Sequence, residues 1–290
     1  MRAALRGDPM IGTAFTAARL LLVEQPGPWG SRGLRQSRFD RNVAVALEER
    51  AEAEGMRLLA VRRPGRTPAG ERRRWAVVDT RDGREGAWWA GYDADAELLD
   101  APLDGSAGVA DPAPLFLVCA HSKRDTCCAV RGRALAAELH RDRPGRVWES
   151  SHTGGHRFAS NVITLPGGVM YGRVPIEAAA DVLDAANRDE VLVDLLRGRI
   201  GVAPAAQAAL ALAHRTTGVT RRRALDVLSV AQDGDRTRVR IGTPHGELDV
   251  DVASTEHTVD GLSCGAFEPD RYVRYDAVSA RSVPPAPATR

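Results

Sequence analysis

Cysteine, lysine and aromatic residues are scarce in this sequence of 290 residues. It contains 4 cysteines, aromatic residues make up 5% of it, and Lys123 is its only lysine. The 40 basic and 38 acidic residues leave a formal net charge of +2. A nearly balanced charge gives no electrostatic reason to expect nucleic acid as a partner. Because no apolar run approaches the roughly 18 residues that a membrane span needs, we also expect no membrane span.

The amino-terminal region lacks the continuous apolar segment of a secretory signal peptide. The sequence does not decide whether translation starts at Met1 or at Met10. A chain with few cysteines and no such signal is expected in a reducing compartment, so we predict a cytoplasmic location. Enrichment in arginine, alanine, glycine and proline is typical of a GC-rich bacterial genome. We therefore attribute the many arginines to the genome rather than to phosphate recognition.

The hydrophobic pattern predicts an α/β protein built from two similar halves. Apolar runs, helical periodicity and turn residues give the order strand, helix, strand, strand near residues 20–80 and again near 115–174. An acidic stretch rich in glycine and alanine, at about 91–113, separates the two.

We divide the chain into an α/β half over 11–100, an α/β unit over 113–215, a small mostly-β carboxyl-terminal segment over 220–278 and a disordered tail over 280–290. Within the third of these segments, RRRALDVLSV (221–230) predicts a helix. The alternating pattern of RTRVRIGTPHGELDVDV (236–252) predicts a β-hairpin. The proline-rich composition of the carboxyl terminus predicts its disorder.

Three of the four cysteines lie in the short stretch LFLVCAHSKRDTCCAV, residues 115–130. Cys119 ends a predicted apolar strand. Cys128 precedes a predicted helix, whose dipole and free N–H groups favour a thiolate. In a reducing compartment such a cluster favours metal binding or redox chemistry over a structural disulfide. Two thiolates from one loop suit a soft metal.

A second candidate motif, SSHTGGHRFASN, follows another predicted strand. His152 and His156 are separated by Thr-Gly-Gly, which predicts an irregular loop whose glycines let both rings turn inward. Two thiolates and two imidazoles are enough for a tetrahedral zinc or a 2Fe–2S cluster. Cys119-Ala-His121 matches the first box of a Rieske site, but no histidine follows Cys127 or Cys128 at the spacing of the second. The fourth cysteine, Cys264, is expected to be buried and inert.

These motifs resemble the signature of the sucrase/ferredoxin-like family, and the likeness runs over most of residues 11–216. The resemblance is carried by Cys119, His121, Arg124-Asp125, Cys128 and His152-x-Gly154-Gly155-His156-Arg157-Phe158-Ala159-x-Asn161. It implies a thioredoxin-like ferredoxin unit preceded by a related α/β half. It also implies a 2Fe–2S cluster with Cys119 and Cys128 on one iron and His152 and His156 on the other. No paired carboxylates support a sucrase activity.

The resemblance implies one-electron transfer rather than catalysis by the chain itself. Imidazole is neutral where thiolate is anionic, so histidine ligands make reduction easier; Rieske centres lie at about −150 to +300 mV, against about −400 mV for plant-type ferredoxins. We expect a potential above the plant-type value. The same residues leave open a thiol–disulfide oxidoreductase using Cys119 and Cys128, or a structural zinc module. The sequence does not identify the redox donor and acceptor proteins, and a homodimer stays open.

Four further residues are expected to support the site from outside the ligand set. We expect His121 to cap or orient a ligand loop. Arg124 and Asp125 are expected to form an ion pair that holds the loop or to donate hydrogen bonds to cluster sulfurs. Arg157 is expected to offset the charge of the cluster or to lie at the surface. Cys127 is expected to be an incidental small residue, although the choice between Cys127 and Cys128 as the ligand stays open.

Overall fold

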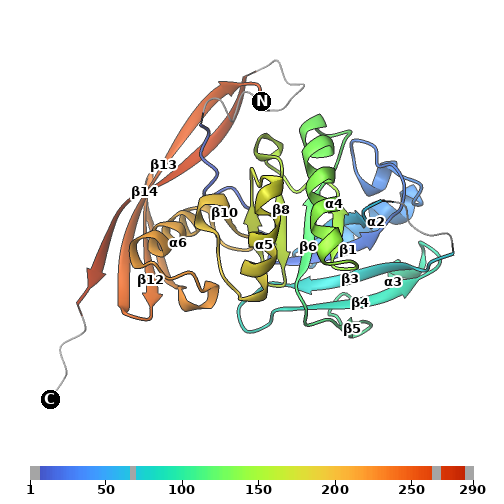
Figure 1. Ribbon diagram of the computed structural model, residues 1–290, viewed down its shortest axis with the longest axis horizontal. Helices are drawn as coiled ribbons and strands as arrows, with labels where there is room; N and C mark the ends of the chain where they lie inside the picture. Colours follow the sequence, from blue (N-terminus) through green and yellow to red (C-terminus); the bar gives the residue numbers. More distant parts are fainter. Residues whose placement is uncertain (1–6, 66–69, 263–268, 285–290) are drawn as a thin grey trace.

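The computed structural model describes residues 7–65, 70–262 and 269–284. They form a ten-stranded mixed sheet and a separate four-stranded antiparallel sheet (Figure 1). The strands are β1 (Arg19–Glu24), β2 (Met56–Arg62), β3 (Arg73–Asp79), β4 (Gly86–Tyr92), β5 (Val109–Ala110), β6 (Leu115–Cys119), β7 (Val147–Ser150), β8 (Val162–Leu165), β9 (Val169–Tyr171), β10 (Leu196–Arg199), β11 (Asp226–Asp233), β12 (Arg236–Thr243), β13 (Gly246–Asp260) and β14 (Pro269–Val283). The helices are α2 (Arg41–Ala53), α3 (Glu97–Asp100), α4 (Arg133–Asp142), α5 (Ala179–Asn187) and α6 (Pro204–Thr217). The prediction of an α/β protein with a small β segment at its carboxyl end is confirmed.

The large sheet contains the same four-stranded unit twice. In the first unit, β1 pairs parallel with β2 and antiparallel with β3, and β3 pairs antiparallel with β4. In the second, β6, β7, β8 and β9 pair in the same directions and order. One helix, α2 or α4, connects the parallel strands of each unit, as parallel neighbours require. The units join where β2 pairs antiparallel with β7. The predicted repeat is therefore confirmed in the topology.

The large sheet curls, and one of its faces encloses a core that both units share. Trp89 of β4 stacks on Trp148 of β7 with ring centroids 5.0 Å apart, although three strands lie between β4 and β7 in the sheet. The outer face is covered by helices: α2 packs on the first unit, while α4 and α5 pack on the second. The Asp40 side chain begins α2 by accepting the N–H groups of Asn42 and Val43.

The small sheet has the order β11-β12-β13-β14, and α6 packs against one face of it. The predicted hairpin is confirmed as β12 and β13. The predicted helix over 221–230 is wrong, because a short 3₁₀ turn at Arg222–Ala224 leads directly into β11. Val227 and Val230 of β11 lie opposite Ile241 and Val239 of β12. This cross-strand pairing outweighs the local helical pattern.

The carboxyl end also differs from the prediction. β14 continues to Val283, so residues 280–283 are part of a strand and not of a disordered tail. The last residues of the predicted tail, 285–290, lie outside the described part of the chain, as does Cys264. Among the described residues, no helix is long and apolar enough to cross a membrane.

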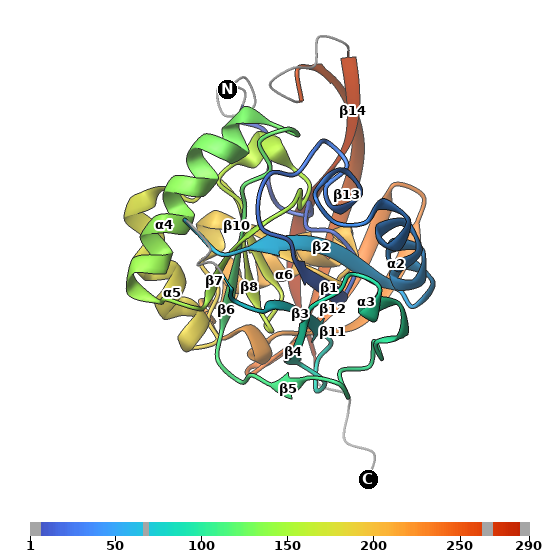
Figure 2. The ribbon, with the colours of Figure 1, turned by 90° about the vertical axis from the view of Figure 1, so that its right-hand side faces the viewer.

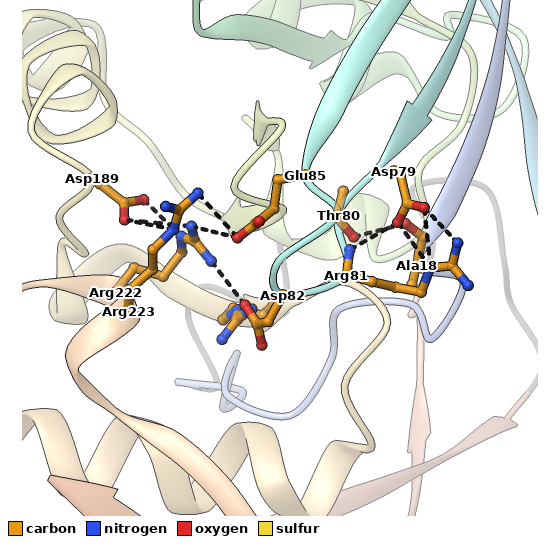
Figure 3. Close-up of polar contacts among 10 residues, drawn as sticks. Ala18, Asp79, Thr80, Arg81, Asp82, Glu85, Asp189, Arg222 and Arg223 are labelled. Atoms are coloured by element: carbon orange, nitrogen blue, oxygen red, sulfur yellow. Dashed lines mark hydrogen bonds and ion pairs between the residues drawn. The ribbon is translucent and has the colours of Figure 1, made fainter. Parts of the chain in front are cut away.

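An ion-pair network around the buried Arg222 joins the two units to the carboxyl-terminal segment (Figure 3). The guanidinium of Arg222 lies 2.7 Å from Asp189, which follows α5. It also lies 3.2 Å from Glu85 and 3.3 Å from Asp82, both in the turn between β3 and β4. One side chain thus connects three segments that are far apart in the sequence.

Candidate metal centre

The candidate site forms where β6 and β7 end side by side. These strands are parallel, so their carboxyl ends meet at one edge, which is where sites in α/β sheets usually form. Cys119 is the last residue of β6 and lies opposite Ser150, the last residue of β7. His152 follows two residues later. The strand pairing therefore brings one cysteine and one histidine together before any loop contributes.

Cys128 joins this pair from the start of the helical segment that leads into α4. It opens a π-helical turn, Cys128–Gly132, a geometry that is frequent at functional sites. The ligand atoms that Cys119, Cys128 and His152 can offer all lie within 4.8 Å of one another. Both cysteines are fully buried and carry free thiols. Cys127 is half-buried and does not belong to this group.

His156 lies beside this group without belonging to it. Gly154 and Gly155 both take a positive φ, of 84° and 63°, and they fold the loop back. The rings of His152 and His156 stack with centroids 5.4 Å apart and planes inclined by 28°. The backbone of Leu262 acts on the ring of His156 and raises its pKa, against the larger effect of burial. The structure thus places the four predicted ligand residues in one region; their binding of a metal stays a prediction.

Two buried ring nitrogens without hydrogen-bond partners among the described residues are compatible with metal binding by these side chains. Nδ1 of His152 and Nδ1 of His156 are both buried and have no hydrogen-bond partner among the described residues. Buried polar atoms nearly always have a partner. A metal-ligating histidine commonly donates its other N–H to a backbone carbonyl, and the contact of His156 with Leu262 suits that arrangement. Two thiols and two such imidazoles match the ligands of zinc or of a 2Fe–2S cluster.

Without a bound metal, the two buried thiols interact strongly with each other. A hydrogen bond from Cys128 holds the pKa of Cys119 well below its usual value, and His152 and the N–H of Thr153 add to this effect. The same hydrogen bond, together with burial, raises the pKa of Cys128. Burial lowers the pKa of His156, which therefore favours the neutral imidazole that binds metals. Cys119 is the thiol that ionises first.

His121 orders the loops of the site through both of its ring nitrogens. The N–H of His152 donates to Nδ1 of His121 at 3.1 Å. Nε2 then carries the proton and donates to the carbonyl of Gly30 at 2.7 Å. The ring also packs edge-on against Trp29. Because both nitrogens contact the backbone, His121 links the loop of Gly30 to the loop of His152.

The other three residues expected to support the site are Asp125, Arg124 and Arg157, and each has a different environment. Asp125 is buried and accepts the N–H of Cys127 at 2.8 Å, so it shapes the turn before Cys128. Arg124 is exposed at the surface of the same turn. Arg157 lies over the ring of Phe158 at 4.5 Å and over the ring of Tyr272 at 4.6 Å.

Several contributors come from parts of the chain that the sequence motifs do not include. Arg57 of β2 donates to the carbonyl of His152 at 3.1 Å. Arg197 of β10 donates to the carbonyl of Gly154 at 3.0 Å. Tyr272 lies on β14 and Leu262 follows β13, at the part of this strand pair that extends beyond β11 and β12 (Figure 2). No local signal in the sequence marks these residues, because only the tertiary fold brings them to the site.

Gly132 permits the contact between the helical segment of Cys128 and the end of β6. A Cβ at this position would lie 2.0 Å from the carbonyl oxygen of Cys119. We expect Gly132→Ala to destabilise the fold by about 1–3 kcal/mol through overpacking, and to lower the metal content because Cys119 moves relative to Cys128. Urea denaturation and metal analysis measure the two effects. In the control Gly242→Ala, the new Cβ meets only the Leu228 side chain at 3.4 Å. Equal behaviour of the two variants would contradict this account.

Comparison with known proteins gives one family and two distant relatives. The profile of a family described as "Sucrase/ferredoxin-like" matches residues 10–198. "Altered inheritance of mitochondria protein 32" from the yeast Meyerozyma guilliermondii is 31% identical over 97 residues, which is 30% of this chain and 34% of the relative. The protein of the same name from Debaryomyces hansenii is 32% identical over 97 residues, 30% of this chain and 36% of the relative. The match thus spans about a third of each relative, both of which are yeast proteins. No solved structure matches the chain.

Proposed function

Because the chain belongs to the sucrase/ferredoxin-like family, we propose that it is an electron-transfer protein carrying a 2Fe–2S cluster. The proposed ligands are Cys119, Cys128, His152 and His156. One observation supports this set above all: two fully buried thiols lie beside two imidazoles whose buried Nδ1 atoms have no partner among the described residues. When bound, such a cluster accepts and releases one electron.

The chain's own residues exclude water on one side of the site and leave the other side approachable. Cys119 and Cys128 are fully buried behind the end of β6 and the start of α4. His152 and His156 are only half-buried. The backbone of Leu262 interacts with the ring of His156 and raises its pKa in opposition to the larger effect of burial. The histidine side is therefore where a redox donor or acceptor protein can approach.

Two alternatives share these residues. The lowered pKa of Cys119 and its hydrogen bond with Cys128 favour thiol–disulfide exchange, but the complete burial of both sulfurs opposes access by a substrate. A structural zinc module uses the same four donors, and the metal would then contribute folding free energy.

The deciding experiment is a visible absorption spectrum of protein purified without oxygen, with iron, sulfide and zinc assayed on the same sample. We expect charge-transfer bands that bleach on reduction, with about two irons and two sulfides per chain. A colourless protein with about one zinc would make the site structural. A colourless, metal-free protein from a preparation shown to retain metals would favour the thiol chemistry.

Histidine ligation makes a prediction about the potential and its dependence on pH. A ligating imidazole keeps a second N–H, which the reduced state holds more tightly, so the potential should fall as pH rises through its titration. We expect His152→Cys or His156→Cys to retain some cluster, to lower the potential because a thiolate is anionic, and to weaken the pH dependence. Iron and sulfide analysis measures the retained cluster, and potentiometric titration from about pH 6 to 10 measures the potential and its dependence on pH. The exposed His245, replaced by cysteine, is the control. If the potential is unchanged in the His152 or the His156 variant, the histidine replaced in that variant is not a ligand.

The surroundings of the protein belong to the same proposal. We place the chain in the cytoplasm, where a reducing milieu keeps both thiols available. Its partners are redox donor and acceptor proteins, with no role for nucleic acid, and a homodimer is compatible with this role. The bacterial origin inferred from composition stays a prediction.

A further inference from the structure

We infer that the buried guanidinium of Arg197 is the counter-charge of the site and favours the one-electron-reduced state of the cluster. This inference rests on the proposed function and goes beyond it, because Arg197 is no ligand. It acts from β10, behind the loop that carries His152 and His156. Arg197 is thus a positioning residue that also sets the potential.

Arg197 is buried without a carboxylate. It is 1% exposed, and its guanidinium donates to Thr13 Oγ1 at 2.9 Å, Thr13 O at 2.6 Å, Gly154 O at 3.0 Å and Asn161 Oδ1 at 2.9 Å. All four acceptors are neutral oxygens. Within residues 7–65, 70–262 and 269–284, no carboxylate forms an ion pair with it. Arg199 on the same strand, by contrast, pairs with Asp82 at 2.6 Å.

A buried charge without an opposite charge is unfavourable, so negative charge that develops nearby is stabilised by Arg197 and stabilises it in turn. Burial lowers the pKa of Arg197 to about 9, and repulsion from Arg157 acts in the same direction. The sulfurs of Cys119 and Cys128 oppose this effect, which places them within electrostatic reach of the guanidinium. Among the charged groups that act most strongly on Arg197, the sulfurs of Cys119 and Cys128 are the negative ones.

The loop between the two histidines lies directly on this guanidinium. A Cβ at Gly155 would lie 2.4 Å from an Arg197 nitrogen. Asn161 spans the same contact, because its amide donates to the carbonyl of Gly155 at 3.1 Å while its oxygen accepts from Arg197. Arg197 consequently holds the loop in place and keeps its charge beside the ligands.

The balance of charge gives the sign of the effect. Two ferric ions, two sulfides, two thiolates and two neutral imidazoles sum to a neutral oxidised cluster, and one added electron leaves a single negative charge. A fixed cation in a medium of low dielectric constant stabilises that charge. Loss of the cation, or its neutralisation by a carboxylate, should therefore weaken electron uptake.

The test compares four variants of the full chain: Arg197→Gln, Arg197→Lys, Asn161→Asp and Arg199→Gln. Dithionite supplies the electron, and the potential is measured with iron and sulfide content on each sample. We expect Arg197→Gln and Asn161→Asp each to bind the electron about tenfold or more weakly, which is about 59 mV for a one-electron couple. Asn161→Asp keeps the guanidinium but gives it a carboxylate. Arg197→Lys and the control Arg199→Gln should stay within about threefold of the original chain.

Each outcome decides a separate point. Unchanged potentials in cluster-loaded Arg197→Gln and Asn161→Asp would leave Arg197 only a structural role and overturn the inference. An equal fall of the potential in Arg197→Lys and Arg197→Gln would also overturn the inference, because lysine keeps the positive charge that glutamine removes. If Arg197→Gln loses its iron, the potential of Asn161→Asp decides. An original chain without redox-active iron would instead overturn the proposed function and this inference with it.

Discussion

Cys128→Ala should remove nearly all iron and sulfide from the protein, whereas Cys127→Ala should keep both. The two cysteines are adjacent and equal in size, but their positions differ. Cys128 is fully buried with its sulfur in the group formed with Cys119 and His152, and Cys127 lies outside that group. A cluster that loses one of its protein ligands has an open, reactive iron. We therefore expect a fall from about two irons per chain to close to none in the Cys128 variant.

The measurement is iron, sulfide and charge-transfer absorbance on samples purified without oxygen. Circular dichroism on the same samples shows whether each variant is folded, which separates loss of a ligand from loss of the fold. In Cys127→Ala the backbone N–H that donates to Asp125 is retained, so the turn before Cys128 keeps its shape. The reverse pattern, with cluster lost only from the Cys127 variant, would move the ligand to Cys127. Retention of the cluster in both would rule out this pair as a source of ligands.

The sequence predicted the repeated architecture because the responsible patterns are local. Continuous apolar runs mark the buried strands β1 and β6, and the helix between β1 and β2 has an apolar period that stops at a glycine. The sequence also indicated which residues gather at the candidate site, because these residues form two short motifs. Each motif directly follows a strand, and neighbouring parallel strands bring both motifs to one edge of the sheet.

Other contributors could not be predicted, for a physical reason. Arg57 and Arg197 reach the site from the ends of separate strands, and each acts through the carbonyl of a loop residue. Nothing in the sequence around them distinguishes them from the many other arginines of the chain. The contact of Leu262 with His156 depends on how far the β13–β14 ribbon extends. Burial and long-range pairing decide such roles, and neither is a property of a short window of sequence.

Arg222→Met should destabilise the fold by about 3–5 kcal/mol, the usual effect of removing one partner from a buried ion pair. Arg222 is 2% exposed, and its removal leaves Glu85 and Asp189 without their buried cation. Burial alone would lower the pKa of Arg222, but its hydrogen bonds with Asp189 and Glu85 raise it overall, as expected for a stabilised charge. Urea denaturation measures the change, with metal content matched between samples because a bound metal adds its own stability.

The adjacent Arg223 is a matched control, because it contacts the same two acids at 3.2 and 3.6 Å but its side chain is 64% exposed. Arg223→Met should cost about 1 kcal/mol or less, as exposed ion pairs do. At acidic pH, the difference in the free energy of unfolding between the original chain and Arg222→Met should become smaller. Burial would raise the pKa of Glu85, but hydrogen bonds and both arginines lower it below its ordinary value of 4.5, so its contribution is present above that pH and is lost as pH falls through the lowered pKa. Two results would show that burial of Arg222 does not determine the strength of this network. One is an equal loss of stability in Arg222→Met and Arg223→Met; the other is a stability difference between the original chain and Arg222→Met that grows in acid.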